Sequence, residues 1–288
     1  MTTPLPHRRA LLACGLGLGL ATLAGPALAA PEVVTVKAGA RDVALTVWRP
    51  VDAKGVVVFS HAAGATPAAY DGLARVWTAA GLMVVAPMHV DSLSHARRAD
   101  YTLQTAFPLR LEDFAAAAAW SAKAAPGLPR GAAGHSYGSL VAMMQGGAME
   151  PMIPARDPAT KAVVAFSSPG VIPGLIGPTA YAKLDVPLLI LTGNKDVVPG
   201  FVPNWQDHLR AFETSPMGGK HAWIGAGVDH FFGGAIIGSA KDPAQAAAFV
   251  EAQALSTAFL RATVLDEASA KAELAAVRSS PVAEIRTR

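Results

Sequence analysis

The feature of this sequence that most constrains its fold is a series of short apolar runs that alternate with segments of helix length. Residues 55–60 and 82–86 are two such runs, rich in valine and with almost no polar side chain. A strand without alternating polar residues is typical of a parallel sheet that is covered on both faces. Residues 67–80, between the two runs, are predicted to form a helix that stops at Gly81. The alternation therefore predicts a right-handed βαβ unit.

The same alternation continues through the rest of the chain. Residues 33–36 and 43–48 are predicted to form an opening hairpin. Further strands are predicted at 130–134, 162–166, 186–192 and 220–224, and further helices at 109–125, 138–149, 202–212 and 243–265. This order favours an α/β fold with a mostly parallel central sheet and helices on both faces. Residues 268–288 are expected to form one more helix and a frayed tail.

Residues 1–29 have the pattern of an export signal peptide. Arg8 and Arg9 precede an apolar stretch at 10–23, and Ala27 and Ala29 form the small-residue pattern at which such signals are cleaved. The apolar stretch is shorter than the roughly 20 residues that span a bilayer, so we expect cleavage rather than a membrane anchor. The mature protein is then expected to be periplasmic or secreted, by the general or the twin-arginine route. We expect residues 30–288 to form a single domain, because no repeat or linker interrupts them.

Charge and cysteine content exclude several classes of function. Without Arg8 and Arg9, 22 of the 24 basic residues remain against 21 acidic ones, and no basic patch points to nucleic acid as a partner. The only cysteine, Cys14, lies in the predicted signal. The mature chain is therefore expected to have neither a disulfide nor a cysteine nucleophile.

The pentapeptide Gly134-His135-Ser136-Tyr137-Gly138 carries the clearest chemical signal. It lies between a predicted strand and a predicted helix, the context in which Gly-x-Ser-x-Gly presents a nucleophilic serine on a sharp turn. The amides at the start of the new helix would face an oxyanion that forms there. The pentapeptide alone could be a glycine-rich turn with an idle serine, but its context favours Ser136 as a nucleophile.

A serine nucleophile needs a base and an acid that orients the base, and both follow in the chain. Asp196 ends a loop after the predicted strand 186–192, which places it at the same edge of a parallel sheet as Ser136. Asp185 precedes that strand and Asp207 lies in a predicted helix, so both are weaker candidates. His230 lies in a glycine-containing loop after the strand 220–224. We predict Asp196 as the acid and His230 as the base.

The serine–acid–histidine order resembles the α/β-hydrolase superfamily. The segment Ser60-His61-Ala62-Ala63-Gly64 is similar to the Ser-His-Gly-x-Gly loop of dienelactone-hydrolase-like and platelet-activating-factor-acetylhydrolase-like esterases. This resemblance implies that the amides of Ala63 and Tyr137 form the oxyanion hole. Dienelactone hydrolases themselves use a cysteine, so only their scaffold carries over.

These patterns predict a serine hydrolase that cleaves small or short-chain carboxylic esters without a cofactor or metal. His89, Asp91 and His95 could in principle bind a metal, but we interpret them as structural or as part of a pocket rim. Two other functions stay open. One is an amidase or small peptidase on the same scaffold, and the other is a non-catalytic binding protein. The oligomeric state is not predicted.

Overall fold

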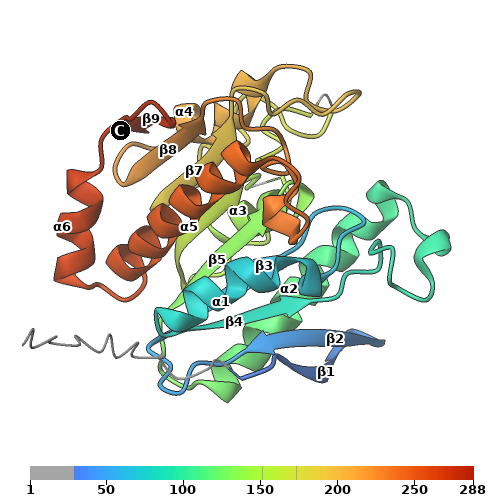
Figure 1. Cartoon of the computed structure of the whole chain (residues 1–288). Helices are drawn as coiled ribbons and strands as arrows, with labels where there is room; N and C mark the ends of the chain where they lie inside the picture. Colours follow the sequence, from blue (N-terminus) through green and yellow to red (C-terminus); the bar gives the residue numbers. More distant parts are fainter. Residues whose placement is uncertain (1–28, 151, 173) are drawn as a thin grey trace, which may run out of the picture.

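The computed structural model describes residues 29–150, 152–172 and 174–288 (Figure 1). The predicted signal at 1–29 therefore lies outside the described residues, except for its last position. Within the described residues all strands join one sheet, in the order β1-β2-β4-β3-β5-β6-β7-β8-β9. Their bounds are β1 Glu32–Ala38, β2 Arg41–Trp48, β3 Gly55–Ser60, β4 Leu82–Pro87, β5 Arg130–His135, β6 Thr160–Phe166, β7 Leu188–Gly193, β8 Lys220–Gly225 and β9 Ala283–Thr287.

The centre of this sheet is parallel and its margins are antiparallel. Strands β4, β3, β5, β6, β7 and β8 pair in parallel, whereas β1 pairs with β2, β2 with β4 and β8 with β9 in antiparallel fashion. Every residue of β3, β4 and β7 is buried. The prediction of a mostly parallel sheet with strands buried on both faces is confirmed.

Helices cover both faces of the sheet (Figure 1). The helices are α1 Asp71–Ala79, α2 Leu103–Ala124, α3 Tyr137–Gln145, α4 Arg210–Thr214, α5 Pro243–Thr263 and α6 Ala268–Ala276. Short 3₁₀ helices occur at η1 Pro67–Tyr70, η2 Arg98–Asp100, η3 Trp205–Leu209 and η4 Ala235–Ile237. None of the described helices is both long and apolar enough to cross a bilayer.

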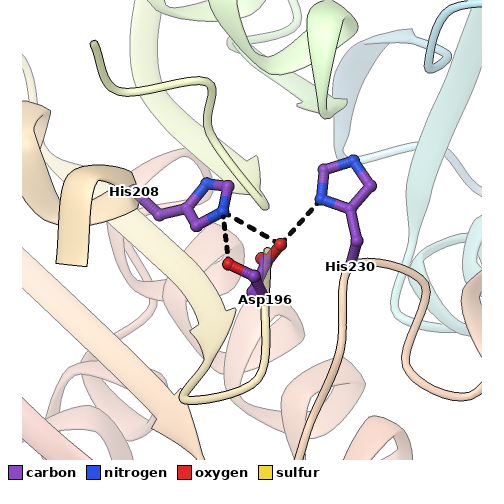
Figure 2. Close-up of side chains that lie close together, drawn as sticks. All are labelled: Asp196, His208 and His230. Carbon is purple, nitrogen blue, oxygen red and sulfur yellow. Dashed lines mark hydrogen bonds and ion pairs between the residues drawn. The ribbon is translucent and has the colours of Figure 1, made fainter. Parts of the chain in front are cut away.

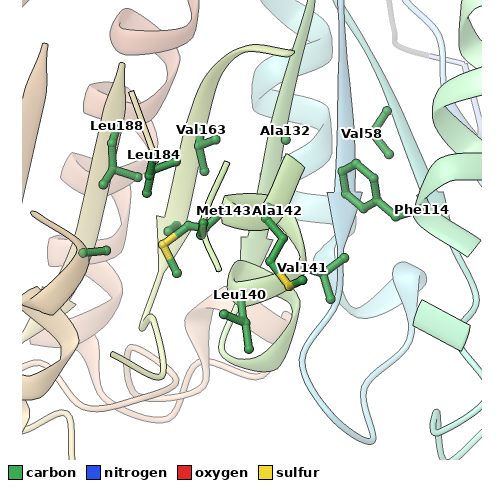
Figure 3. Close-up of a cluster of buried hydrophobic side chains, with 14 of the residues drawn as sticks. Val58, Phe114, Ala132, Leu140, Val141, Ala142, Met143, Val163, Leu184 and Leu188 are labelled. Atoms are coloured by element: carbon green, nitrogen blue, oxygen red, sulfur yellow. The ribbon is translucent and has the colours of Figure 1, made fainter. Parts of the chain in front are cut away.

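Two buried cores, one on each face, hold these layers together. Val56 and Val58 of β3 belong to the core under α2, α3 and α4, while Val57 and Phe59 belong to the core under α1 and α5. This division follows from strand geometry, because successive side chains point to opposite faces. Figure 3 shows the first core, where side chains of α3 such as Leu140 meet the central strands. The serine-bearing turn therefore leads directly into a helix whose residues Gly138 to Gln145 are all buried.

Several predicted helix boundaries differ from the observed ones, and α3, predicted to reach 149, ends at Gln145. Helix α2 begins at Leu103 rather than at 109, and Pro108 lies inside it. Thr102 caps the start of this helix through reciprocal hydrogen bonds with Thr105. The predicted helix at 202–212 is two short pieces, η3 and α4.

The prediction of a frayed C-terminal tail is wrong. Residues 283–287 form β9, which pairs antiparallel with β8 and opposes Ile285 to Trp223. Ala283 is buried and Ile285 is half-buried, whereas Glu284 and Thr287 are exposed. An edge strand of five residues carries only two inward-facing side chains, and one of them is an alanine. That pattern is too short to be distinguished from a polar tail in the sequence.

Candidate active site

The three residues predicted to carry the chemistry follow strands that end at one edge of the sheet. Ser136 follows β5, Asp196 lies in the loop after β7, and His230 lies in the loop after β8. These strands are part of the same parallel set, so their carboxyl ends share an edge. The topology therefore brings together loops that are distant in the chain. His135 and His230, for example, are hydrogen-bonded although 95 positions separate them.

The Ser136 turn is as sharp as the pentapeptide predicts. Ser136 has φ 54° and ψ −122°, a conformation that costs free energy for a residue with a side chain. A β-carbon at Gly134 would collide with the backbone of Gly138, and one at Gly138 would collide with the carbonyl oxygen of Ser60. The glycines of the motif are thus required by close backbone approach, and the start of α3 lies directly against the loop that follows β3.

Asp196 and His230 are joined by a hydrogen bond. Nδ1 of His230 donates to Oδ1 of Asp196 at 2.7 Å, and the Thr192 hydroxyl donates to Oδ2 at 2.8 Å. Asp196 is fully buried, whereas the His230 side chain is 11% exposed. Burial alone would raise the pKa of Asp196, but hydrogen bonds from two histidines hold that pKa far below its usual value. In Figure 2 the second ring nitrogen of His230 lies on the side turned away from Asp196.

His135 connects the serine turn to His230. Nε2 of His135 donates to the carbonyl oxygen of His230 at 2.8 Å, and the Ser167 hydroxyl donates to the same oxygen at 3.2 Å. Burial lowers the pKa of His135 to about 3, so its ring is neutral and its Nδ1 accepts a hydrogen bond from the Tyr70 hydroxyl, at 2.8 Å. The residue next to Ser136 therefore fixes the backbone of the predicted base.

The described residues show no hydrogen bond between the Ser136 hydroxyl and the His230 ring. Contacts of this kind are often long in free enzymes and shorten when substrate binds. The structure thus brings Asp196 and His230 into direct contact, and it links Ser136 to His230 through His135.

A second histidine, which the sequence analysis missed, also binds Asp196. Nε2 of His208 donates to Oδ1 of Asp196 at 2.9 Å and to its carbonyl oxygen at 3.0 Å. Nδ1 of the same ring donates to the carbonyl oxygen of Ser168. Because both nitrogens face only acceptors, both carry protons and the ring is an imidazolium. Burial lowers the pKa of His208, but the Asp196 carboxylate outweighs this and the pKa is raised overall.

These three residues also form the one group of potential metal ligands among the described residues. One ligand atom from each of Asp196, His208 and His230 lies within 4.8 Å of the others. The histidine nitrogens that face the carboxylate, however, already donate hydrogen bonds to it, and the other nitrogen of His208 is held by a carbonyl. This donor arrangement fits a protonated network better than a cation.

His89 and Asp91, which the sequence offered as possible metal ligands together with His95, belong to a buried hydrogen-bond network. His89 and Asp91 are fully buried, whereas His95 is half-buried at the surface. Within the described ranges these three residues do not form a three-ligand group. His89 instead bonds Ser60 and Asp113, at 2.9 and 3.0 Å. The expected structural role is therefore right for His89 and Asp91, and a place on the pocket rim is wrong for them.

The two amides implied for the oxyanion hole lie in adjoining segments. Ala63 is exposed in the loop after β3, and Tyr137 is the first residue of α3, where helical amides lack an internal acceptor. The contact of Gly138 with Ser60 and His61 brings these segments together. Ala63 and Tyr137 thus lie in adjoining segments at the edge of the sheet where Ser136 lies, and their role in an oxyanion hole stays a prediction.

Large apolar side chains are exposed on three loops at this edge. Leu93 follows β4 and is 77% exposed, Phe201 follows β7 and is 55% exposed, and Phe231 follows β8 and is 40% exposed. The Phe231 ring lies 5.1 Å from the His230 ring, centroid to centroid. These three residues give this edge of the sheet an exposed apolar rim, and Phe231 is the member that contacts His230.

No protein-family model and no curated protein matches this chain. Solved structures do resemble it. A dienelactone hydrolase from Anabaena variabilis has a TM-score of 0.59 at 20% sequence identity, over 81% of this chain and 98% of its own. An α/β serine hydrolase homologue from Coxiella burnetii has a TM-score of 0.55 at 16% identity, over 73% and 94% of the two chains.

An esterase from Pyrococcus furiosus has a TM-score of 0.57 at 16% identity, and covers 81% of this chain and 93% of its own. Identities this low establish the fold and not the reaction. Together with the sheet order and the serine turn, they support one structural conclusion. The chain has the α/β-hydrolase fold.

Proposed function

We propose that this protein is a serine hydrolase that cleaves carboxylic esters, with Ser136 as nucleophile, His230 as base and Asp196 as the acid that orients it. The observation that carries the proposal is the 2.7 Å hydrogen bond between Asp196 and His230 at the edge where Ser136 lies on a strained turn. An aspartate that accepts a hydrogen bond from Nδ1–H holds the tautomer in which Nε2 of the imidazole can act as a base.

The reaction proceeds in two halves. His230 takes the proton of the Ser136 hydroxyl as its oxygen attacks the ester carbonyl, and the amides of Ala63 and Tyr137 bind the oxyanion. The tetrahedral intermediate collapses, the C–O bond to the alcohol breaks, and His230 returns the proton to the leaving alcohol. Water then attacks the acyl-enzyme with the same base and releases the carboxylic acid.

An ester of small or moderate size is the substrate class that the site favours. The rim of Leu93, Phe201 and Phe231 offers apolar contact to an acyl chain. The structural neighbours are themselves a dienelactone hydrolase and an esterase, which supports ester chemistry over amide cleavage. No cofactor or metal is required for this reaction.

The proposal extends to where the protein acts. We propose that residues 1–29 direct export and are removed, so that residues 30–288 act in the periplasm or outside the cell. N-terminal sequencing of the exported protein should then begin at Ala30. An intact N-terminus on exported protein would contradict removal.

Substitution of the nucleophile tests the function directly. Ser136→Ala should lower kcat for a p-nitrophenyl short-chain ester by roughly three orders of magnitude or more and abolish labelling by a fluorophosphonate. Ser121→Ala is a matched control, because this buried serine bonds only the carbonyl of Ala118 within its own helix α2. Undiminished hydrolysis by the Ser136 variant would refute the assignment, and turnover of matched amides but not esters would make the protein an amidase.

A further inference from the structure

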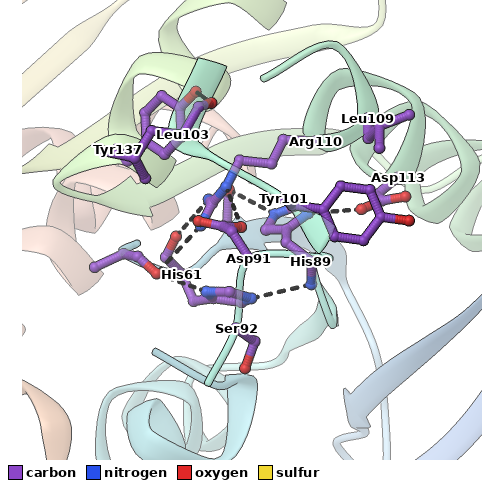
Figure 4. A network of polar contacts seen from close by, with 12 residues as sticks. His61, His89, Asp91, Ser92, Tyr101, Leu103, Leu109, Arg110, Asp113 and Tyr137 are labelled. Carbon is purple, nitrogen blue, oxygen red and sulfur yellow. Dashed lines mark hydrogen bonds and ion pairs between the residues drawn. The ribbon is translucent and has the colours of Figure 1, made fainter. Parts of the chain in front are cut away.

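We propose that Arg110 is a positioning residue for the oxyanion hole, which holds the peptide units that present the Ala63 amide and packs against Tyr137. The inference rests on the proposed serine-hydrolase function. Arg110 lies on α2, far in sequence from both segments, and its side chain is fully buried (Figure 4). Arg110 does not touch the reacting atoms and acts through the backbone around them.

The guanidinium binds two consecutive carbonyl groups of the loop after β3. Nη1 donates to the carbonyl oxygen of His61 at 2.8 Å, and Nη2 donates to that of Ala62 at 3.2 Å. Nδ1 of His61 donates to the Ala62 oxygen as well, at 2.7 Å. The backbone N–H of Ala65 donates to it too, at 3.1 Å, so three donors hold the Ala62 carbonyl, and Arg110 is the only one of them from outside this loop.

The direction of the Ala63 amide follows from that carbonyl. The C=O of Ala62 and the N–H of Ala63 belong to one planar trans peptide unit, in which they point in opposite directions. A carbonyl drawn inward by Arg110 therefore turns the next N–H outward, toward the side on which Ala63 is exposed. The N–H of Ala62 itself donates to the Tyr70 hydroxyl at 3.1 Å, which fixes the preceding unit.

Arg110 also touches the second oxyanion donor. Its guanidinium carbon lies 4.7 Å from the centroid of the Tyr137 ring, within the range of a cation–π contact. The Tyr137 hydroxyl donates to the carbonyl of Leu103 at 2.8 Å, which anchors the start of α3 to the start of α2. One side chain thus contacts both segments that supply the hole.

Because Asp91 neutralises the charge of Arg110, Arg110 acts by holding the backbone in position rather than by its charge. It accepts from Nε of Arg110 at 2.8 Å and from Nη2 at 2.9 Å, and both side chains are fully buried. The pair is neutral overall, so it adds little net charge beside a developing oxyanion. What it adds is a planar fork of fixed orientation, which a lysine ammonium cannot reproduce.

The test compares Arg110→Lys and Arg110→Met with the wild-type enzyme, using a p-nitrophenyl ester and an aliphatic trifluoromethyl ketone. The ketone forms a tetrahedral adduct with the serine and so reports on the oxyanion hole. Both variants should lose kcat by about 10²-fold, the cost of one misplaced oxyanion donor, with KM changed less than about twofold. Affinity for the ketone should fall by the same factor as kcat/KM.

Arg130→Met is the matched control. Arg130 forms an ion pair with Asp157 on the opposite edge of the sheet and is nearly as buried, so this variant should lower Tm and leave kcat unchanged. A folded Arg110→Lys or Arg110→Met enzyme with wild-type kcat, or with lost kcat but wild-type ketone affinity, would overturn the role of Arg110. If Arg110→Met does not fold, the lysine variant decides. A wild-type protein without esterase activity would instead overturn the proposed function.

Discussion

Two buried polar clusters lie at the active edge of the sheet, and they differ in whether their protons can move. The acid–base cluster of Asp196, His208 and His230 is built from groups that titrate, and one of its members reaches solvent. The loop cluster around Arg110 and Asp91 is closed to solvent and centres on a guanidinium that stays protonated. The first cluster is suited to carrying a proton, and the second is suited to holding a backbone still.

This difference predicts in which cluster a single substitution lowers kcat the most. Asp196→Asn should lower kcat by roughly 10⁴-fold, because an amide can donate to Nδ1 of His230 and leave the wrong nitrogen protonated. The loss should exceed that of either Arg110 variant by a wide margin. Steady-state kinetics on the same ester, with circular dichroism to verify folding, would measure both. A smaller loss for Asp196→Asn than for Arg110→Met would reverse the comparison.

The second prediction concerns stability against pH. The pKa of His208 is raised in the folded protein, so its contribution to stability is complete below its ordinary pKa of about 6.5 and is lost as pH rises through the folded value. The free energy of unfolding should therefore decrease above about pH 6.5. Burial raises the pKa of Asp113 to about 6, so its contribution to stability changes mostly below the pH range in which His208 loses its proton. Asp196, with its lowered pKa, is ionised throughout it.

Urea unfolding at about pH 6.5 and about pH 8.5 would measure this effect. Wild type should be less stable at the higher pH, and His208→Gln should show a smaller difference between the two conditions. His95→Gln, a substitution of a half-buried surface histidine, is the control and should retain the wild-type difference. An identical pH dependence in His208→Gln and wild type would show that His208 is not the charged member of its cluster.

The smallest effect is expected from metal removal. Because Asp196, His208 and His230 are joined by proton-bearing hydrogen bonds, dialysis against EDTA should leave kcat/KM within about twofold of its initial value. Activity that is lost on chelation and restored by a divalent cation would mean that a metal, rather than protons, joins these side chains.

The sequence predicted what depends on local pattern. Apolar runs identified the buried strands, and glycines placed two positions on either side of Ser136 identified the turn. Asp196 and His230 could be placed because residues after parallel strands share one edge. Both positions therefore follow from strand order and need no knowledge of side-chain packing.

The residues that the sequence did not predict act through contacts distant in the chain. His208 follows Asp196 by twelve positions, and nothing in a predicted helix indicates that its ring turns back to the acid. Arg110 lies in a long helix, 48 residues from the Ala62 carbonyl that it binds. Such contacts depend on how helices pack over the sheet, and a local sequence pattern does not predict that packing.

The close approach at Gly138 has a consequence for how this protein can diversify. Any side chain at that position would strike the carbonyl oxygen of Ser60, so the nucleophile turn and the loop beside it cannot vary independently. Leu93, Phe201 and Phe231, in contrast, stand on three separate exposed loops. Lineages that acquire new substrates are therefore expected to do so by exchanging these loops one at a time, around a reaction centre inherited as a unit.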